Sequence, residues 1–262
     1  MSRVLIVGCG AVGVRAGDAL HARGHAVIGL RRSDAQRRSP WPMLQGDGAS
    51  QALHDHIARA WGRIDVVLIT ATPGLRSGTG GNHLDRVIAR CARAWPHARM
   101  VYTGSTAVYA DTGGAQFAED APLGRSPRAR ALLALEAAVL ARGNALVLRA
   151  GALAGRRRAM HSPRLASGTM RIRGSMRRSL SWVHEDDLAA LAAAACTGLG
   201  SGAINVTAPV WPSIASFHRR QAAELGLRIS LHDDDSPVPE RRIASAALAH
   251  RWGGVLQTAW WV

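Results

Sequence analysis

The sequence predicts an α/β fold, a doubly wound parallel sheet with helices on both faces, from three observations. Strand and helix signals alternate through the first 150 residues. A glycine-rich turn follows the first apolar run, at residues 8–13. A continuous apolar run at 65–70 has the composition of a strand buried on both faces. Alternation of this kind is typical of parallel sheets, because each parallel connection must cross over, usually through a helix.

The elements follow from local patterns. Short apolar runs bounded by turn residues predict strands, and apolar residues at helical spacing predict helices. The predicted strands are 3–7, 26–30, 65–70, 98–103, 145–149 and 203–207, and the predicted helices are 11–23, 50–61, 82–94, 128–142, 185–195 and 213–225.

The pattern changes after residue 150, which predicts two regions. Residues 1–150 form the core of the sheet, and residues 151–262 form a small C-terminal lobe for substrate, interleaved with the core as one domain. Residues 155–180 are rich in Arg, Gly and Ser and contain eight arginines. A loop of that length in a compact domain is usually functional.

Composition excludes several classes of protein. The sequence has no run of 18 or more apolar residues, so we expect no membrane span. The N-terminus lacks the pattern of a signal peptide. Three widely spaced cysteines do not form a disulfide framework or a zinc motif, so we expect a reducing cytoplasm. The net charge of +15 comes with 33 basic residues, all arginine. Without aromatic platforms or a binding motif, this charge does not favour a nucleic-acid partner. The acidic run 233–235 is interpreted as a solvated turn rather than a metal site.

The glycine turn predicts a dinucleotide site of the Rossmann type. Gly8 allows a sharp turn out of the strand, Gly10 lets the backbone approach a pyrophosphate, and Gly13 lets the helix pack closely. The pyrophosphate would lie at the helix N-terminus, where free N–H groups favour an anion. The predicted cofactor contacts in this turn are Gly8, Cys9, Gly10, Ala11, Val12 and Gly13.

The end of the second strand indicates which cofactor binds. Sites for NAD usually carry Asp or Glu there, bonded to the ribose 2′-hydroxyl. This chain instead has Arg31, Arg32 and Ser33. A guanidinium pair suits a 2′-phosphate, so NADP (NADPH) is the predicted cofactor and NAD the less favoured one.

Five segments, in order along the chain, resemble motifs of one family. The glycine turn is the first, and the second, 100–109, is similar to a strand that runs into Ser-Ser-x-x-Val-Tyr-Gly. The others are 148–151, 181–189 and 203–207, which resemble Leu-Arg-x-x-x-x-x-Gly, Ile-His-Val-x-Asp-Leu-Ala and Tyr-Asn-Val-x. Together they resemble the extended short-chain dehydrogenase/reductase family, in its atypical branch similar to sugar-nucleotide epimerases.

The resemblance implies roles for individual residues. Ser105, followed by Thr106, lies where the family has a hydroxyl that bonds the substrate oxygen. Asp47, followed by Gly48, matches an aspartate that contacts adenine. His184 and Asp187 lie in a motif that mainly anchors the C-terminal lobe, as a hydrogen-bond network or helix cap. Thr70, Ala71 and Thr72 would line the ribose and phosphates of the cofactor.

The family's Tyr-x-x-x-Lys acid–base pair is absent. Aligning Glu136 with the family's glutamate puts Arg128 at the tyrosine position and Leu132 at the lysine position. Three explanations stay open: a substitute acid acts, the reaction needs little acid, or the protein binds NADP as a sensor without turnover. Candidate acids are Ser105, Tyr109 and His161, and Arg128 or Arg130 could favour a phenolate.

The arginine-rich segment lies where the family builds its substrate pocket. One interpretation is capture of an anionic substrate by Arg156, His161, Arg171 and Arg173. The other is a solvated basic loop. We therefore expect an NADP-dependent oxidoreductase for a small polar, anionic metabolite, with a catalytically degenerate NADP sensor as the alternative. Family members are often dimers, so a homodimer is also considered, although the sequence shows no decisive interface helix.

Overall fold

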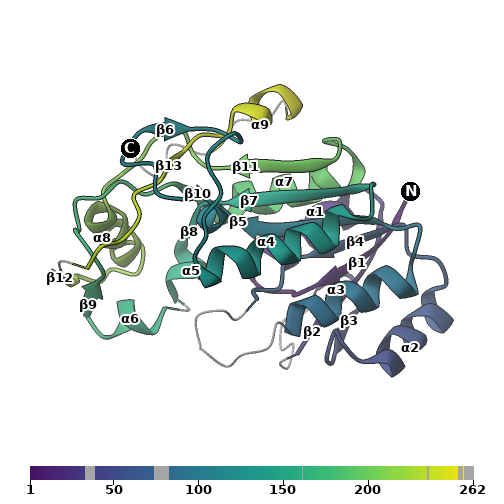
Figure 1. Cartoon of the computed structure of the whole chain (residues 1–262). Coiled ribbons are helices and arrows are strands. Elements are labelled where there is room, and N and C mark those ends of the chain that lie inside the picture. The colour runs from purple at the N-terminus through teal and green to yellow at the C-terminus, as the bar shows by residue number, and fades with distance from the viewer. Residues whose placement is uncertain (33–38, 74–82, 161, 235, 253–255, 257–262) are drawn as a thin grey trace. The chain divides into compact units, whose positions relative to one another are not determined.

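The central element of the computed structural model is a seven-stranded sheet with the order β11-β7-β5-β4-β1-β2-β3 (Figure 1). The structure describes residues 1–32, 39–73, 83–160, 162–234, 236–252 and 256. Pairing is parallel between β1 and both β2 and β4, between β2 and β3, and between β4 and β5. The predicted α/β class, with a Rossmann-like parallel sheet, is confirmed. The strands are β1 (Arg3–Val7), β2 (Ala26–Arg31), β3 (Met43–Gln45), β4 (Val66–Ile69), β5 (Arg99–Ser105), β7 (Ala145–Ala150) and β11 (Gly202–Val206).

The larger helices lie close to the predicted ranges. Polar side chains start two of them: Ser50 accepts a hydrogen bond from the backbone N–H of Leu53, and Ser213 accepts one from that of Ser216. Such caps satisfy N–H groups that have no partner within the helix. The helices are α1 (Ala11–Ala22), α2 (Gln51–Trp61), α3 (His83–Ala94), α4 (Pro127–Leu140), α7 (Glu185–Thr197) and α8 (Ile214–Ala223).

The chain forms two compact units whose segments alternate along the sequence. The first comprises Met1–Gly104, Arg130–Leu148 and Ala189–Ala203. The second comprises Ser105–Ala129, Arg149–Leu188 and Ile204–Val262. The chain passes between the units several times, because β5 and β7 each continue from the first unit into the second. The division into a core of residues 1–150 and an interleaved lobe of residues 151–262 stays a prediction.

The first unit owes its core to strands that alternate side chains between two faces. Leu5 and Val7 of β1 join a buried cluster with Ile57 of α2 and Val87 of α3. Ile6 points to the opposite face, where a Cβ at Gly17 of α1 would lie 3.0 Å from it. Each large aliphatic side chain buried in this way contributes about 1.5–3 kcal/mol. This burial holds the carboxyl ends of β1, β2 and β4 in register.

The second unit is built from short elements around a smaller apolar cluster. The segment 155–180, expected to be one long loop, holds two short helices and a strand. Leu165, Met170 and Ile172 from this segment pack with Ile214 and Ala222 of α8. A few apolar residues are enough to anchor this segment. Its arginine-rich composition alone does not show this. The short strand pairs are β8 (Ala152–Ala154) with β10 (Trp182–His184), β9 (Thr169–Ile172) with β12 (Ser230–Asp233), and β6 (Gln116–Phe117) with β13 (Arg242–Ile243); the short helices are α5 (Arg156–Met160), α6 (Pro163–Ala166) and α9 (Ala246–Arg251).

Candidate active site

Two glycines of the turn between β1 and α1 have no room for a side chain. Gly8 has a φ of +100°, and a Cβ there would lie 2.4 Å from the backbone nitrogen of Ala71. A Cβ at Gly13 would lie 2.6 Å from the carbonyl oxygen of Gly8 and from Oγ1 of Thr70. The Thr70 hydroxyl donates a hydrogen bond of 2.5 Å to that carbonyl. These contacts draw the end of β4 and the first turn of α1 together around Gly8.

The third glycine faces open space. A Cβ at Gly10 would meet no atom within 4 Å in the part of the chain that the structure describes. Gly10 is also the N-cap of α1, with no side-chain cap and no acidic residue in the first helical turn. Among the described residues, the space beside Gly10 is open, and the first turn of α1 carries no acidic side chain. A pyrophosphate needs this arrangement, so the residues present fit a dinucleotide.

Cys9 and Val12 are buried and form the wall of the turn. The Cys9 thiol lies 3.5 Å from the carbonyl oxygen of Ile6, and burial raises the pKa of the thiol to about 11. A thiol in this state is neutral and a poor nucleophile. Ala11 opens α1 and is partly exposed.

The ends of β2, β3 and β4 bring further predicted residues to the same edge of the first unit. Arg31 is half-buried at the end of β2, and its carbonyl oxygen accepts a hydrogen bond of 2.9 Å from Gly46. Arg32 is exposed. Thr70 and Ala71 both donate backbone hydrogen bonds to Val7, at 2.9 and 3.2 Å. Thr72 follows them and is exposed, whereas Ser33 lies outside the described residues.

The loop after β3 is held by two histidines that sequence reasoning missed. Nε2 of His83 lies 2.8 Å from Oδ1 of Asp47. Nε2 of His54 lies 2.8 Å from the carbonyl oxygen of Gly48. His54 is buried and stacks on Trp95, with ring centroids 5.1 Å apart. Its position inside an otherwise apolar helix face was the only sequence signal for this contact.

Ser105 and Thr106 lie at the start of the second unit. Oγ of Ser105 accepts a hydrogen bond of 3.2 Å from the backbone N–H of Ala107, which leaves its O–H proton to donate elsewhere. The buried Thr106 hydroxyl instead donates to the carbonyl oxygen of Ala150 at 3.4 Å. Of these two hydroxyls, Ser105 keeps the freer donor.

Tyr109 lies wholly inside the second unit, with 0% of its surface exposed. Its hydroxyl donates to Oδ1 of Asn205 at 2.7 Å and accepts from the Arg149 guanidinium at 2.8 Å. Burial raises the pKa of this phenol, although the bond from Arg149 opposes the shift. The hydroxyl is thus engaged on both sides by protein groups.

In the family, the helix that corresponds to α4 carries the Tyr-x-x-x-Lys pair. In this chain, α4 has no acid at either of the two positions. Arg128 is exposed near the start of α4, and Leu132 is buried one turn later. The other tyrosine, Tyr102, is buried in β5, and its pKa is raised by burial and by the charge of Glu136. These surroundings hold the Tyr102 phenol protonated.

The predicted substrate arginines lie on two elements of the second unit and directly after one of them. Arg156 opens α5 and donates to the carbonyl oxygen of Glu224. Arg171 is exposed on β9, and Arg173 is exposed directly after it. The buried Glu185 anchors α5, because its carboxylate accepts the N–H groups of Arg157 and Arg158 at 3.1 and 3.0 Å. His161 lies outside the described residues.

The motif that resembles Ile-His-Val-x-Asp-Leu-Ala joins β10 to α7. Nδ1 of His184 accepts a hydrogen bond of 3.3 Å from the backbone N–H of Asp186. Asp187 is buried in the first turn of α7. Both positions are consistent with a helix-start network, and their anchoring role stays a prediction.

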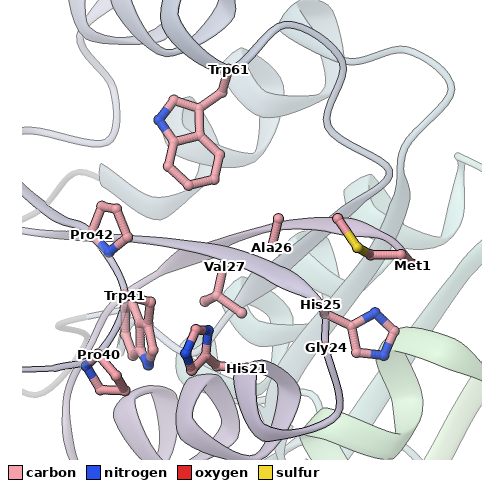
Figure 2. Close-up of a pocket in the computed structure, with 10 residues that line it drawn as sticks. All are labelled: Met1, His21, Gly24, His25, Ala26, Val27, Pro40, Trp41, Pro42 and Trp61. Atoms are coloured by element: carbon pink, nitrogen blue, oxygen red, sulfur yellow. The ribbon is translucent and has the colours of Figure 1, made fainter.

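A shallow pocket of about 260 Å³ lies elsewhere on the first unit (Figure 2). Trp41, Trp61 and His21 line it, together with Ala26 and Val27 at the start of β2. The glycine turn lies at the carboxyl end of β1, and Arg31 at the carboxyl end of β2. The pocket is therefore at the opposite end of these strands from the dinucleotide turn, and ligands of open α/β sheets bind outside the carboxyl ends.

The described residues contain neither a metal cluster nor a membrane-spanning helix. No group of three or more His, Cys, Asp or Glu side chains could hold a metal ion there. Within the same ranges, no helix has the length and apolar character needed to cross a membrane.

Comparison with solved structures shows the fold of the chain. MoeE5 in complex with UDP-glucose and NAD is 20% identical, with a TM-score of 0.77 over 98% of this chain and 94% of that one. The Bordetella bronchiseptica enzyme WbmH, in complex with NAD+, is 19% identical, with a TM-score of 0.78 over 99% and 95%. UDP-glucose 4-epimerase from Thermotoga maritima, with UDP-glucose, is 13% identical, with a TM-score of 0.79 over 97% and 94%.

The chain has the fold of the NAD-dependent epimerases and dehydratases. The structural neighbours thus agree with the resemblance to extended short-chain dehydrogenases/reductases that the motifs predict. A scan against protein-family models and a search of curated proteins found no match.

Proposed function

We propose that this protein is an NADP-dependent oxidoreductase for a small polar, anionic metabolite. The observation that carries the proposal is the glycine turn. Gly8 and Gly13 are closed to any side chain, while Gly10 faces open space at an uncapped helix N-terminus. The open position at Gly10 leaves room for a pyrophosphate at the N–H groups of α1.

The choice of NADP rests on Arg31 and Arg32. Structural neighbours whose descriptions name a cofactor name NAD, so the proposed preference is specific to this chain. The half-buried Arg31 ends β2, where a carboxylate would otherwise bond the ribose 2′-hydroxyl. A guanidinium there would bind a 2′-phosphate through charge-assisted hydrogen bonds.

Ser105 is our candidate for proton donation to the substrate. Tyr102 pairs with Ile69 in the sheet, and Thr103 Oγ1 donates to the carbonyl oxygen of Ile69 at 3.3 Å. Ser105 follows two residues later, at the carboxyl end of β5, where ligands of such sheets bind. The bond from Ala107 orients its oxygen and leaves its proton available. A bound nicotinamide would supply or accept the hydride, and Ser105 would donate a hydrogen bond to the substrate oxygen.

Tyr109 is assigned a structural role in this proposal. A proton donor must reach the substrate oxygen within hydrogen-bond distance, and the Tyr109 hydroxyl is buried between Asn205 and Arg149. The raised pKa of this phenol also disfavours the phenolate. Arg128 remains a candidate contact for an anionic substrate, because it replaces the tyrosine of the family on α4.

Nucleotide sugars are the first substrates to screen. Neighbours of this fold are described with UDP-glucose and UDP-glucuronic acid, and both are anionic. Arg156, Arg171 and Arg173 are proposed contacts for such a group, supported by their charge and by the anchoring of α5 through Glu185.

A dinucleotide sensor is the second candidate, and a specific observation favours it. The positions of the missing acid–base pair hold an exposed arginine and a buried leucine, Arg128 and Leu132. A sensor would bind NADPH tightly and show no turnover with any substrate. Both candidates share the dinucleotide site and differ only in catalysis.

Calorimetric titration with NADPH, NADP and NADH tests the cofactor first. We expect NADPH to bind tightly, and Arg31→Ala to weaken it about tenfold or more by removing a charge-assisted hydrogen bond. Arg63→Ala is the matched control, because Arg63 precedes β4, at the opposite end of the sheet, and pairs with Asp65. Absence of binding to any dinucleotide would overturn the proposal.

Oxidation of NADPH in the presence of nucleotide sugars and other anionic carbonyl compounds then separates the two candidates. Turnover that Ser105→Ala abolishes supports the oxidoreductase. Tight NADPH binding without turnover across the panel favours the sensor.

A further inference from the structure

The guanidinium of Arg241 is held by the protein on one side only. Its Nε donates to the carbonyl oxygens of Tyr109 at 2.7 Å and of Ala110 at 3.2 Å. Its two Nη groups make no hydrogen bond to any residue that the structure describes. Because the five N–H donors of a guanidinium lie in one plane, fixing Nε also orients the Nη groups. The half-buried Arg241 thus offers an oriented pair of donors that suits an oxyanion.

Arg128 lies close to the carbonyl that holds Arg241. A Cβ at Gly124 would lie 3.0 Å from the carbonyl oxygen of Tyr109 and 3.1 Å from the Cβ of Ala129, the residue after Arg128. Little room for a side chain therefore remains between this carbonyl and the first turn of α4. Arg128 extends from that turn, is exposed, and belongs to the same compact unit as Arg241.

The positive charges around Arg241 are only partly compensated. Burial lowers the pKa of Arg241, and the carboxylate of Asp111 opposes the shift, whereas the charges of Arg128 and Arg178 add to it. Oδ1 of Asp111 accepts two backbone N–H groups. The carboxylate of Glu240, which lies near Arg178, accepts another. Three guanidinium groups thus share two carboxylates that already hold the backbone, and an added anion would relieve their repulsion.

This pair of arginines also lies beside the residue that we assign as proton donor. Ser105 precedes the short 3₁₀ turn at 106–108, and Tyr109 closes that turn with an N–H bond of 3.1 Å. Arg241 is therefore fixed to the end of the turn that begins at Ser105. Arg128 occupies the position at which the resemblance puts the family's tyrosine. An anion bound by Arg128 and Arg241 would accordingly belong to the reacting end of a substrate.

We propose that Arg241 and Arg128 bind a carboxylate that the substrate carries near its reacting carbon. The inference rests on the proposed function and deepens it, because it names the substrate as a carboxylic acid. A carboxylate is planar, so its two oxygens match the two Nη groups of Arg241, and Arg128 supplies the second charge. The arginine at the family's tyrosine position then binds substrate and transfers no proton, which leaves proton donation to Ser105.

The test compares two nucleotide sugars that differ only at C6. UDP-glucuronic acid carries a carboxylate there, and UDP-glucose carries a hydroxymethyl group. Each is titrated by calorimetry into protein saturated with NADPH. Wild-type protein should bind UDP-glucuronic acid about tenfold more tightly, the discrimination expected from a charge-assisted pair. Arg128→Gln should reduce this ratio toward one, mainly by weakening UDP-glucuronic acid.

Three further variants separate a carboxylate site from a general effect of charge. Arg241→Lys keeps the charge without the planar fork and should also reduce the ratio. The double variant should lose less than the product of the two separate losses, because both side chains bind one carboxylate. Arg125→Gln is the matched control, because it removes the same charge from another exposed arginine three residues before Arg128, and it should leave the ratio unchanged. Thermal unfolding shows which variants are folded, and Arg128→Gln with its control still decides if Arg241→Lys does not fold.

The outcomes distinguish this site from the function on which it rests. A ratio near one in wild type, or an equal ratio in wild type, Arg128→Gln and Arg241→Lys, overturns the carboxylate site. Equal weakening of both sugars by Arg241→Lys would assign the fork to the diphosphate and would overturn it as well. Protein that binds NADPH but neither sugar overturns this inference and leaves dinucleotide binding intact, whereas failure to bind NADPH overturns both.

Discussion

The phenol of Tyr109 and the side chain of Asn205 form a buried hydrogen bond of 2.7 Å. Asn205 also donates from Nδ2 to the carbonyl oxygen of Ala244, and from its backbone N–H to Glu119, both at 2.9 Å. The Arg149 guanidinium lies over the tyrosine ring, 5.1 Å from its centroid. One tyrosine therefore links residues that are distant in sequence within the second unit.

Tyr109→Phe should destabilise the protein without slowing catalysis. The change leaves Oδ1 of Asn205 buried without its donor, which costs about 1–3 kcal/mol in the free energy of unfolding. Urea unfolding measures this loss, and NADPH oxidation with the substrate found in the screen measures turnover. Ser105→Ala should do the reverse, with kcat lowered by a factor on the order of 10²–10⁴. A folded Tyr109→Phe protein without turnover would make Tyr109 the acid instead.

Gly10→Ala should remove cofactor binding from a protein that still folds. Gly10 has extended backbone angles, and its Cβ would meet no described atom, so the free energy of unfolding should change by less than about 1 kcal/mol. The methyl group would occupy the space proposed for the pyrophosphate and weaken NADPH by about tenfold or more.

Gly13→Ala is the contrasting variant. Its Cβ would lie 2.6 Å from Gly8 and Thr70, so overpacking should cost about 1–3 kcal/mol of stability. Calorimetry should show the loss of NADPH binding in Gly10→Ala, and thermal unfolding should show the loss of stability in Gly13→Ala. Equal loss of stability in both would mean that Gly10 is structural.

Trp41 and Gly29 should show strong energetic coupling. A Cβ at Gly29 would lie 2.5 Å from Cζ3 of Trp41 and 2.6 Å from Sγ of Cys9. Gly29→Ala should therefore cost about 1–3 kcal/mol in the free energy of unfolding. Trp41→Phe shortens the ring and also loses the indole bond to Asp18, which is 3.0 Å long.

The double variant measures this coupling by denaturant unfolding. In the Trp41→Phe background, Gly29→Ala should cost clearly less, because the ring that it collides with is smaller. Strictly additive costs would mean that Sγ of Cys9, and not the indole, resists a side chain at Gly29.

His54 should make the protein less stable in mild acid. Burial lowers the pKa of His54 below its ordinary value of 6.5, so the folded state favours the neutral ring. Its contribution is complete above pH 6.5 and is lost as the pH falls from there toward the folded-state pKa, because the unfolded chain takes up the proton first.

A variant of His54 isolates this contribution. His54→Gln keeps an N–H donor for Gly48 and does not titrate, so its stability should fall less between pH 7 and pH 5 than that of wild type. Urea unfolding at both pH values measures the difference. His218, whose pKa burial also lowers, stays in both proteins and supplies the common background. Identical losses in the two proteins would exclude His54 as a source of acid sensitivity.

Local patterns were sufficient for the first half of the fold. The strand at 3–7 and the helix that begins at Ala11 are observed at these positions, because an apolar run and a glycine turn each depend on neighbouring residues. Short strands such as β3 and β9 were not predicted, because so few residues show no clear alternation of apolar and polar side chains. The arginine-rich segment 155–180 was expected to be a loop because its helices and strand are equally short.

Contacts between distant residues could not be predicted. Nothing in the sequence near Asp47 indicates that His83, the first residue of α3, donates to its carboxylate. The buried Tyr109 donates its hydroxyl proton to Asn205, which lies 96 positions away. A motif shows that a tyrosine is present but does not show whether its hydroxyl is accessible.

The sequence by itself determined the longer strands and helices, the three glycines of the turn and the basic end of β2, because each depends on residues within about one turn or strand. Only the tertiary structure decided which side chains are available for chemistry. Availability depends on burial and on hydrogen bonds closed across the fold, as Tyr109 and Asp47 show. Those bonds form when strands from distant segments pair, and no local pattern encodes their partners.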